Sequence, residues 1–202
     1  MCIRDSLYDV NSGSISIAGH DVREIEIESL REQVCYVPPH PVLFDTTLSA
    51  NLRLSKGTPS EAELKEVVDY VGLATWSSAL QEGLSQRIGP GGHRLSSGQQ
   101  QRLGICRAIL QRPRILILDE ATSSVDAGSE QQLLSSLRRI LPGTTIVVIS
   151  HRLSALHCVD RVIVLELGRV IEDDEPTALL RNSGAYSRLF SAGTAACTPV
   201  FE

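Results

Sequence analysis

Two adjacent carboxylates, Asp119 and Glu120, stand at the end of a short aliphatic run, residues 115–118. Pro113 breaks any helix before this run, which therefore predicts a strand buried on both faces. Open parallel α/β sheets bind their ligands at the C-terminal edge of the strands. Asp119 is thus a candidate Mg²⁺ ligand and Glu120 a candidate general base. The alternative is a buried strand that merely runs into an acidic loop.

A second group of residues is suited to binding an anion. The glycine-rich segment 89–99 runs directly into a predicted helix, and Ser96, Ser97 and Gly98 stand at its entry. A helix N-terminus presents unpaired backbone N–H groups and the positive end of the helix dipole, so phosphate is its natural ligand. A helix capped by its own serine behind a flexible loop explains the same residues without any ligand.

A third polar group follows the next apolar strand, residues 144–149, which ends in Ser150, His151 and Arg152. Histidine is the side chain whose charge changes most readily near neutral pH, yet a lone histidine is more often structural. His151 is a candidate functional residue because it stands at the end of a strand, as the two carboxylates do.

Hydrophobic periodicity and turn residues predict the elements that position these groups. Strands are predicted over residues 14–18, 34–37, 115–118, 144–149, 161–165 and 169–171. Helices are predicted over residues 26–33, 64–71, 100–111, 130–141 and in short pieces over 176–189, with a capping box at 60–63. The apolar residues Trp76, Leu80 and Leu84 indicate packing rather than a ligand site.

The order of these motifs resembles the nucleotide-binding domain of ATP-binding cassette (ABC) transporters, and the resemblance covers about residues 7–191. The matching segments are Leu95-Ser96-Ser97-Gly98-Gln99 for the signature motif, Asp119-Glu120 for the Walker B pair, Ser123-Ser124-Val125-Asp126 for the D-loop, and His151 for the switch histidine. Residues 120–126 and 150–154 are most similar to export-type members. The resemblance implies an α/β fold: a partial RecA-like P-loop NTPase core with an antiparallel β edge and an inserted α-helical lobe at about residues 46–110.

The resemblance also implies roles for single residues. Asp119 would hold Mg²⁺ through a water molecule, and Glu120 would orient or deprotonate the water that attacks the γ-phosphate of ATP. His151 would contact that phosphate or Glu120. The signature residues 95–99 would instead bind the ATP of a second nucleotide-binding domain. The active unit would then be a head-to-tail dimer, with Asp126 on the line between its two sites.

One departure from the family pattern concerns the phosphate-binding loop. The pattern G-x-x-x-x-G-K-[ST] is absent, because neither Lys56 nor Lys65 follows a glycine. In the family this loop precedes the position of Leu7. We therefore expect an N-terminally truncated domain, with residues 1–6 a non-native start, that binds ATP weakly by itself. A transmembrane domain encoded upstream would attach it to the cytoplasmic face of a membrane, and residues 192–202 are expected to be a disordered tail.

Two further departures leave the function open. Pro39 stands where the family usually has a glutamine beside Mg²⁺ or the attacking water, and Ser97 stands where the signature has its first glycine. The first interpretation is an ATPase that drives export. The second is a nucleotide-gated dimerisation half of a heterodimeric exporter with a degenerate site. The third is a soluble ABC ATPase that transports nothing.

Composition excludes several classes of function. The net charge of −5 offers no general attraction for nucleic acid. The five cysteines include no Cys-x-x-Cys pair, so neither a disulfide framework nor a zinc site is indicated. No apolar run approaches the roughly 20 residues that span a bilayer. The transported substrate cannot be read from this sequence, because in exporters the membrane domain selects it.

Overall fold

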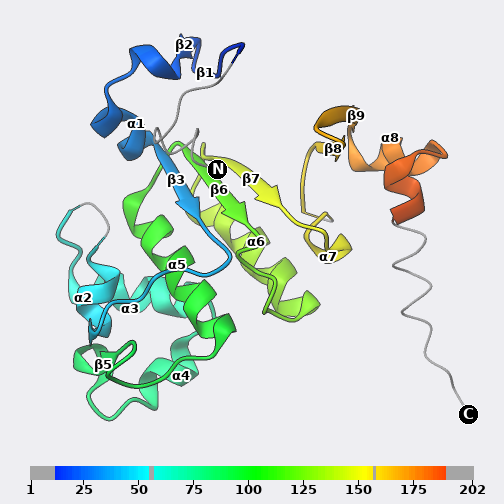
Figure 1. Ribbon diagram of the computed structural model, residues 1–202. Helices are drawn as coiled ribbons and strands as arrows, with labels where there is room; N and C mark the ends of the chain where they lie inside the picture. Colours follow the sequence, from blue (N-terminus) through cyan, green and yellow to red (C-terminus); the bar gives the residue numbers. More distant parts are fainter. Residues whose placement is uncertain (1–11, 55–56, 157, 190–202) are drawn as a thin grey trace, which may run out of the picture. The chain divides into compact units, whose positions relative to one another are not determined.

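A computed structural model describes residues 12–54, 57–156 and 158–189 of the chain (Figure 1). The predictions for residues 1–6 and 192–202 lie outside this part. The chain forms two compact units, each described by itself. The first contains the residues up to Ser124 together with 136–149, and the second contains 125–135 and the residues from Ser150 onward.

The first unit is built on a three-stranded parallel sheet in the order β3 (Val34–Val37), β6 (Ile115–Asp119), β7 (Thr145–Ile149). Strand β6 lies in the middle, with Leu116 and Leu118 almost fully buried, as expected for an aliphatic strand covered on both faces. The predicted strand over 144–149 is present but only half buried, because β7 is the edge of the described sheet. The mixed α/β class predicted from the sequence is confirmed.

Helix α5 (Ser97–Gln111) is the longest element of this unit and packs against β3 (Figure 1). Its buried stripe includes Leu103, Ile105 and Cys106. Gly104 permits the close approach, because a Cβ there would lie 2.8 Å from the ring of Pro41. Arg107 Nη1 donates to the carbonyl of Val42 at 2.6 Å, so the helix also holds the loop that follows β3.

The described part of the segment between β3 and α5 contains several short helices joined by loops. Its elements are β4 (Thr46–Thr47), α2 (Leu48–Leu52), α3 (Glu61–Tyr70), α4 (Ala74–Ser78), η2 (Gly83–Ser85) and β5 (Arg87–Ile88), with β4 antiparallel to β5. Helix α3 begins with the predicted capping box between Ser60 and Glu63. Gly72, at a φ of +74°, ends its last turn. Trp76 and Leu80 are half buried, in keeping with a packing role.

The described N-terminal part is a hairpin followed by a helix: β1 (Ser16–Ile17), β2 (His20–Asp21), η1 (Val22–Glu24) and α1 (Ile27–Gln33). The strand predicted over 14–18 is shorter at both ends, and it stops at Ile17 because Ala18 and Gly19 both have positive φ and form the turn. Helix α1 starts one residue later than predicted, at Ile27.

Helix α6 (Ala127–Ile140) passes from the second unit into the first. It begins three residues earlier than the predicted 130–141. The reason is an N-cap: Asp126 Oδ1 accepts a hydrogen bond from the backbone N–H of Ser129 at 2.9 Å. Glu130, expected at the start of the helix, lies one turn inside it and is fully buried.

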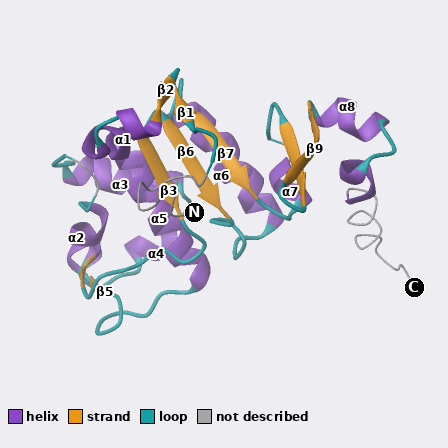
Figure 2. Cartoon of the chain, turned by 45° about the horizontal axis from the view of Figure 1, so that its top comes forward, coloured by secondary structure: helices purple, strands orange, loops and turns teal. Residues whose placement is uncertain are grey.

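The second unit contains α7 (Leu153–Leu156), an antiparallel hairpin of β8 (Val162–Glu166) with β9 (Arg169–Asp174), and α8 (Pro176–Arg181) (Figure 2). Its small core consists of Val162, Leu179 and Tyr186. Strand β9 runs three residues beyond the predicted 169–171. The Glu172 carboxylate within this extension accepts hydrogen bonds from the backbone of Ala185 and Tyr186 at 2.7 and 2.8 Å.

The capping box of α3 gives a stability prediction. Ser60→Ala removes the hydroxyl that accepts from the N–H of Glu63, and should lower the free energy of unfolding by about 1 kcal/mol in urea denaturation. Ser78→Ala is the matched control, because this exposed hydroxyl only donates to Thr75 within α4. Equal losses in the two variants would contradict a capping role.

The same box predicts a pH dependence. Hydrogen bonds from the backbone N–H and the hydroxyl of Ser60 hold the pKa of Glu63 below its ordinary 4.5. The folded state therefore favours the ionised carboxylate, so this contribution is complete above the ordinary pKa and is lost as pH falls through the lowered one. The stability gap between the parent chain and Ser60→Ala should shrink on acidification, as measured by urea denaturation at several pH values. A gap that grows on acidification would contradict it.

Candidate functional site

The two carboxylates lie where the sequence placed them, at the C-terminal end of β6. Asp119 is the last residue of the strand and is 6% exposed. Its Oδ2 accepts a hydrogen bond of 2.9 Å from the hydroxyl of Tyr36 on β3. A buried carboxylate needs such partners, because an unpaired one pays the full cost of leaving water. Tyr36 thus holds the Asp119 carboxylate at the edge of the sheet.

Glu120 leaves the strand in a left-handed backbone conformation, with a φ of +47°. A non-glycine residue pays for this conformation, of order 1–3 kcal/mol, and keeps it only where its surroundings hold it. Its N–H donates to the carbonyl of Ile149 on β7 at 2.9 Å, and its carbonyl accepts from the N–H of Ser123 at 3.1 Å. The chain therefore turns sharply at the predicted general base.

The signature residues lie at the start of α5. Ser96 is the N-cap, and it forms a capping box with Gln99 through hydrogen bonds of 2.9 and 3.3 Å. The alternative of a helix capped by its own serine therefore accounts for Ser96 and Gln99. Ser97 is the first helical residue and is exposed. Gly98 lies against the loop after β6, where a Cβ would come within 3.1 Å of the carbonyl of Ser124.

The four D-loop residues divide between the units. Ser123 and Ser124 belong to the first unit, together with Asp119, Glu120 and the signature residues. Val125 and Asp126 belong to the second, where Asp126 caps α6 and the carbonyl of Val125 accepts from Arg152 Nη1 at 2.6 Å.

His151 is exposed and also belongs to the second unit. It follows Ile149, the register partner of Asp119, by two residues. The segment around it is tied within its own unit to buried Glu130, which lies 3.7 Å from Arg152 and accepts a hydrogen bond from Ser154. The structure therefore brings the Walker B pair, Ser123, Ser124 and the signature residues together in one unit, and describes His151 in the other.

Two residues of this site were missed from the sequence, Tyr36 and Gln101. Gln101 is 1% exposed, and its amide contacts the ends of the loops around Glu120. A signal existed for it, since a glutamine at position 101 is in helical phase with the buried Ile105 and Ala108. A polar residue on a buried stripe requires a partner. Tyr36 gave a weaker signal, a hydroxyl within an otherwise apolar strand.

The carboxylates at the end of β6 are of the type that binds Mg²⁺ in nucleotide sites. Among the described residues, no group of three or more His, Cys, Asp or Glu side chains is placed to hold a metal ion. In nucleotide sites Mg²⁺ takes one or two carboxylates and completes its shell with water and phosphate oxygens. The Asp119 carboxylate, oriented by Tyr36, is a donor of that kind.

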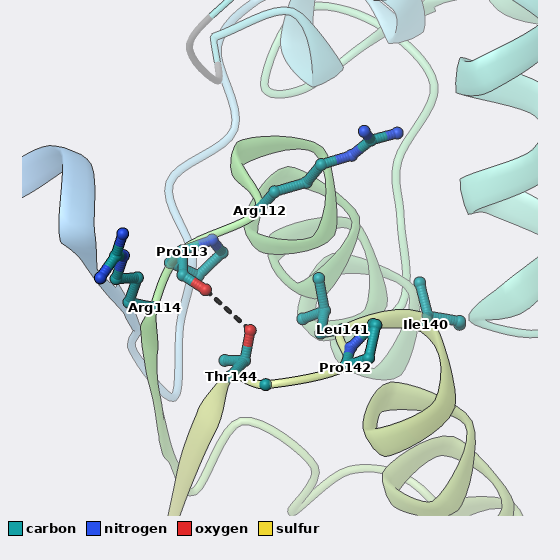
Figure 3. A pocket seen from close by; sticks show the side chains of 8 residues that line it. Arg112, Pro113, Arg114, Ile140, Leu141, Pro142 and Thr144 are labelled. Atoms are coloured by element: carbon teal, nitrogen blue, oxygen red, sulfur yellow. Dashed lines mark hydrogen bonds between the residues drawn. The ribbon is translucent and has the colours of Figure 1, made fainter.

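A surface pocket of about 530 Å³ lies at the other end of the sheet (Figure 3). It is lined by the residues that lead into β6 and β7: Arg112, Pro113, Arg114, Ile140, Leu141, Pro142, Gly143 and Thr144. Thr144 Oγ1 donates to the carbonyl of Pro113 at 2.8 Å and ties these two entries together. The full length of β6 separates this pocket from Asp119, so it is distinct from the candidate site.

Burial makes two cysteines near these elements unreactive. It raises the pKa of Cys35 on β3 to about 11 and raises that of Cys106 on α5 further. Because the thiolate is the reactive form, both thiols are poor nucleophiles at neutral pH.

A parallel sheet whose middle strand ends in a carboxylate pair, beside the N-terminus of a glycine- and serine-led helix, defines a partial RecA-like nucleotide-binding domain. The chain belongs to the ABC transporter family, because the family described as "ABC transporter" matches residues 3–123. None of the described helices is long and apolar enough to cross a membrane.

Curated relatives carry the names of a flippase, of ABC transporters and of putative export ATP-binding/permease proteins. The ATP-dependent lipid A-core flippase of Burkholderia orbicola (strain AU 1054) is 40% identical over 182 residues, which are 90% of this chain and 30% of the flippase. ABC transporter B family member 14 of Arabidopsis thaliana is 36% identical over 185 residues, 91% of this chain and 15% of that protein.

A solved structure gives the same assignment. The structure of a bacterial Atm1-family ABC exporter with ATP bound matches with a TM-score of 0.90 and 32% identity. The match covers 96% of this chain and 34% of that one. This chain therefore spans about a third or less of the length of these relatives.

The contact between Tyr36 and Asp119 can be tested in this chain. Tyr36→Phe removes the donor to a buried carboxylate and should lower the free energy of unfolding by about 1.5–3 kcal/mol, the usual worth of a hydrogen bond to a charged group. The measurement is urea denaturation at neutral pH. Tyr70→Phe is the control, because that hydroxyl donates to Glu66 at the same 2.9 Å on an exposed helix face. A loss no larger than that of the control would show that Asp119 does not depend on Tyr36.

Proposed function

We propose that this chain is the ATP-binding and ATP-hydrolysing motor domain of an export-type ABC transporter. The observation that supports this most is the arrangement at the end of β6, where Asp119 is oriented by Tyr36 and Glu120 leaves the strand in a constrained turn. Such geometry holds the proposed metal-binding carboxylate in place and fixes the backbone of the proposed base beside it, and phosphoryl transfer depends almost entirely on positioning.

In this proposal each site residue has a role. Asp119 holds Mg²⁺, which neutralises charge on the phosphates of ATP, and Glu120 orients or deprotonates the attacking water. His151 contacts the γ-phosphate or Glu120. The signature residues 95–99 bind the ATP held by a second nucleotide-binding domain, and Asp126 lies where the two domains meet. The working unit is a head-to-tail dimer.

The domain works on the cytoplasmic face of a membrane, attached to a transmembrane domain in a longer protein. The names of its relatives, a flippase and export ATP-binding/permease proteins, support this. By itself the 202-residue chain binds ATP weakly, since its sequence holds no G-x-x-x-x-G-K-[ST] loop to cradle the phosphates. Neither nucleic acid nor a zinc ion is a partner in this proposal.

A second function is favoured by two specific residues, Pro39 and Ser97. Pro39 offers no side-chain group to Mg²⁺ or water, and the exposed Ser97 places a Cβ where the signature backbone would approach phosphate. In this alternative the domain binds ATP and dimerises but hardly hydrolyses it, as one half of a heterodimeric exporter. ATP-dependent dimerisation without measurable turnover in the longer protein would favour it.

The hydrolytic role is tested by Glu120→Gln in the longer transporter that contains this domain, reconstituted in lipid. We expect turnover of ATP to fall by about 10²-fold to 10⁴-fold, the usual contribution of a general base, while ATP binding and ATP-dependent dimerisation persist. Glu82→Gln is the control, because Glu82 is exposed beside η2 and has no role in this proposal. Turnover within a few-fold of the parent protein would remove Glu120 from this role.

A further inference from the structure

The side-chain amide of Gln101 forms several hydrogen bonds within the first unit. Gln101 stands in the second turn of α5 and is 1% exposed. Its Nε2 donates to the Ser123 hydroxyl at 3.0 Å, to the Pro39 carbonyl at 3.1 Å and to the Glu120 carbonyl at 3.4 Å. Its Oε1 accepts from the backbone N–H of Ser124 at 3.0 Å. One side chain thus joins two separate segments, the loop after β3 and the turn after β6, to the helix.

Only an amide satisfies this set of partners. The two N–H groups of Nε2 are shared among three acceptor oxygens, while Oε1 accepts a hydrogen bond from a backbone N–H. A carboxylate of the same shape has no N–H to give, and a methionine has neither a donor nor a comparable acceptor. Because the site is buried, each partner left without its hydrogen bond adds a desolvation cost.

The contact with Glu120 bears on the candidate site. The left-handed backbone at Glu120 needs external support, and its carbonyl is held by the N–H of Ser123 and by Gln101. Gln101 also holds the end of the turn that follows, through the Ser123 hydroxyl and the Ser124 N–H. The backbone that carries the predicted base is therefore fixed to the helix that carries the signature residues.

The contact with Pro39 adds the loop after β3. Pro39 has no polar side chain, but its carbonyl is used by Gln101. Arg107, a turn and a half further along α5, grips the same loop through the carbonyl of Val42. The loop after β3 and the turn after β6 are thus attached to the same helix.

We propose that Gln101 is a positioning residue for ATP hydrolysis: it fixes the Glu120 turn and the Ser123–Ser124 loop to the signature helix. This inference rests on the proposed function. Because the start of α5 carries the residues that meet a second domain, the attachment transmits the position of that domain to the base. Gln101 itself does not touch the nucleotide and acts through Glu120.

The first test is Gln101→Met in the longer transporter. We expect kcat to fall by about 10-fold to 100-fold, the cost of misplacing a reacting group by about 1 Å, with the KM for ATP changed by less than about threefold. Gln111→Met is the matched control: its Nε2 donates to the Arg31 carbonyl at 2.8 Å on the exposed end of the same helix. A rise in KM at unchanged kcat, or an equal loss in the control, would overturn the positioning role.

A double-variant measurement shows whether Gln101 acts through Glu120. In the Glu120→Gln background, Gln101→Met should cost little further turnover, because the group that it positions is already removed. Independent, multiplying losses would overturn the proposal. If Glu120→Gln alone leaves turnover intact, the proposed hydrolytic function is overturned. That outcome is distinguishable from failure of the positioning role, because it does not involve the Gln101 variant.

Hydrogen exchange gives a readout in this chain that needs no activity. Gln101→Met should speed exchange of the Ser124 amide relative to the amides of β6, whereas Gln111→Met should not. Ser123→Ala, which removes one acceptor and keeps the glutamine, should act in the same direction with a smaller effect, and it covers the case in which Gln101→Met fails to fold. Unchanged exchange at Ser124 in a folded Gln101→Met chain would overturn the attachment.

Discussion

The burial of β6 is the constraint on which the first unit depends. The strand lies between β3 and β7, with Leu116 and Leu118 shielded from water. The backbone groups of a strand that is paired on both sides form hydrogen bonds with its two neighbours. The last residues of β6 are polar, however, and lie at the C-terminal edge of the sheet, where this pairing ends. The contacts of Asp119 and Glu120 give these polar groups hydrogen-bond partners without filling the C-terminal edge of the sheet.

The partners come from three directions and differ in what they fix. Tyr36 satisfies a side chain, the Asp119 carboxylate, and leaves its other oxygen sites for a cation or water. Ile149 and Gln101 satisfy the backbone of Glu120, so they fix where the chain goes rather than what the carboxylate meets. This division suits a site in which the metal ligand must be rigid and the base must adjust to a water molecule.

Sequence patterns predicted the elements well because they reflect local rules. The aliphatic run of β6, the capping box at Ser60 and the helix after the glycine-rich loop are each set by neighbours in the sequence. The partial exposure of β7 and the hydrogen bond of Tyr36 depend on which strands lie side by side, which periodicity does not contain. The early start of α6 is also set locally, by the Asp126 cap.

The two departures from the family pattern act on different parts of the site. Pro39 has no side-chain group to offer the Mg²⁺ of the proposed function, yet its carbonyl accepts a hydrogen bond from Gln101, which holds the loop in place. Ser97 follows the N-cap and takes no part in the capping box, so its hydroxyl and Cβ are presented outward without disturbing the helix. A substitution that spares the fold but changes an outward surface alters what the signature residues can bind. Under the proposed function, the change at Ser97 therefore bears on the nucleotide of a second domain, and the change at Pro39 bears on this chain's own site.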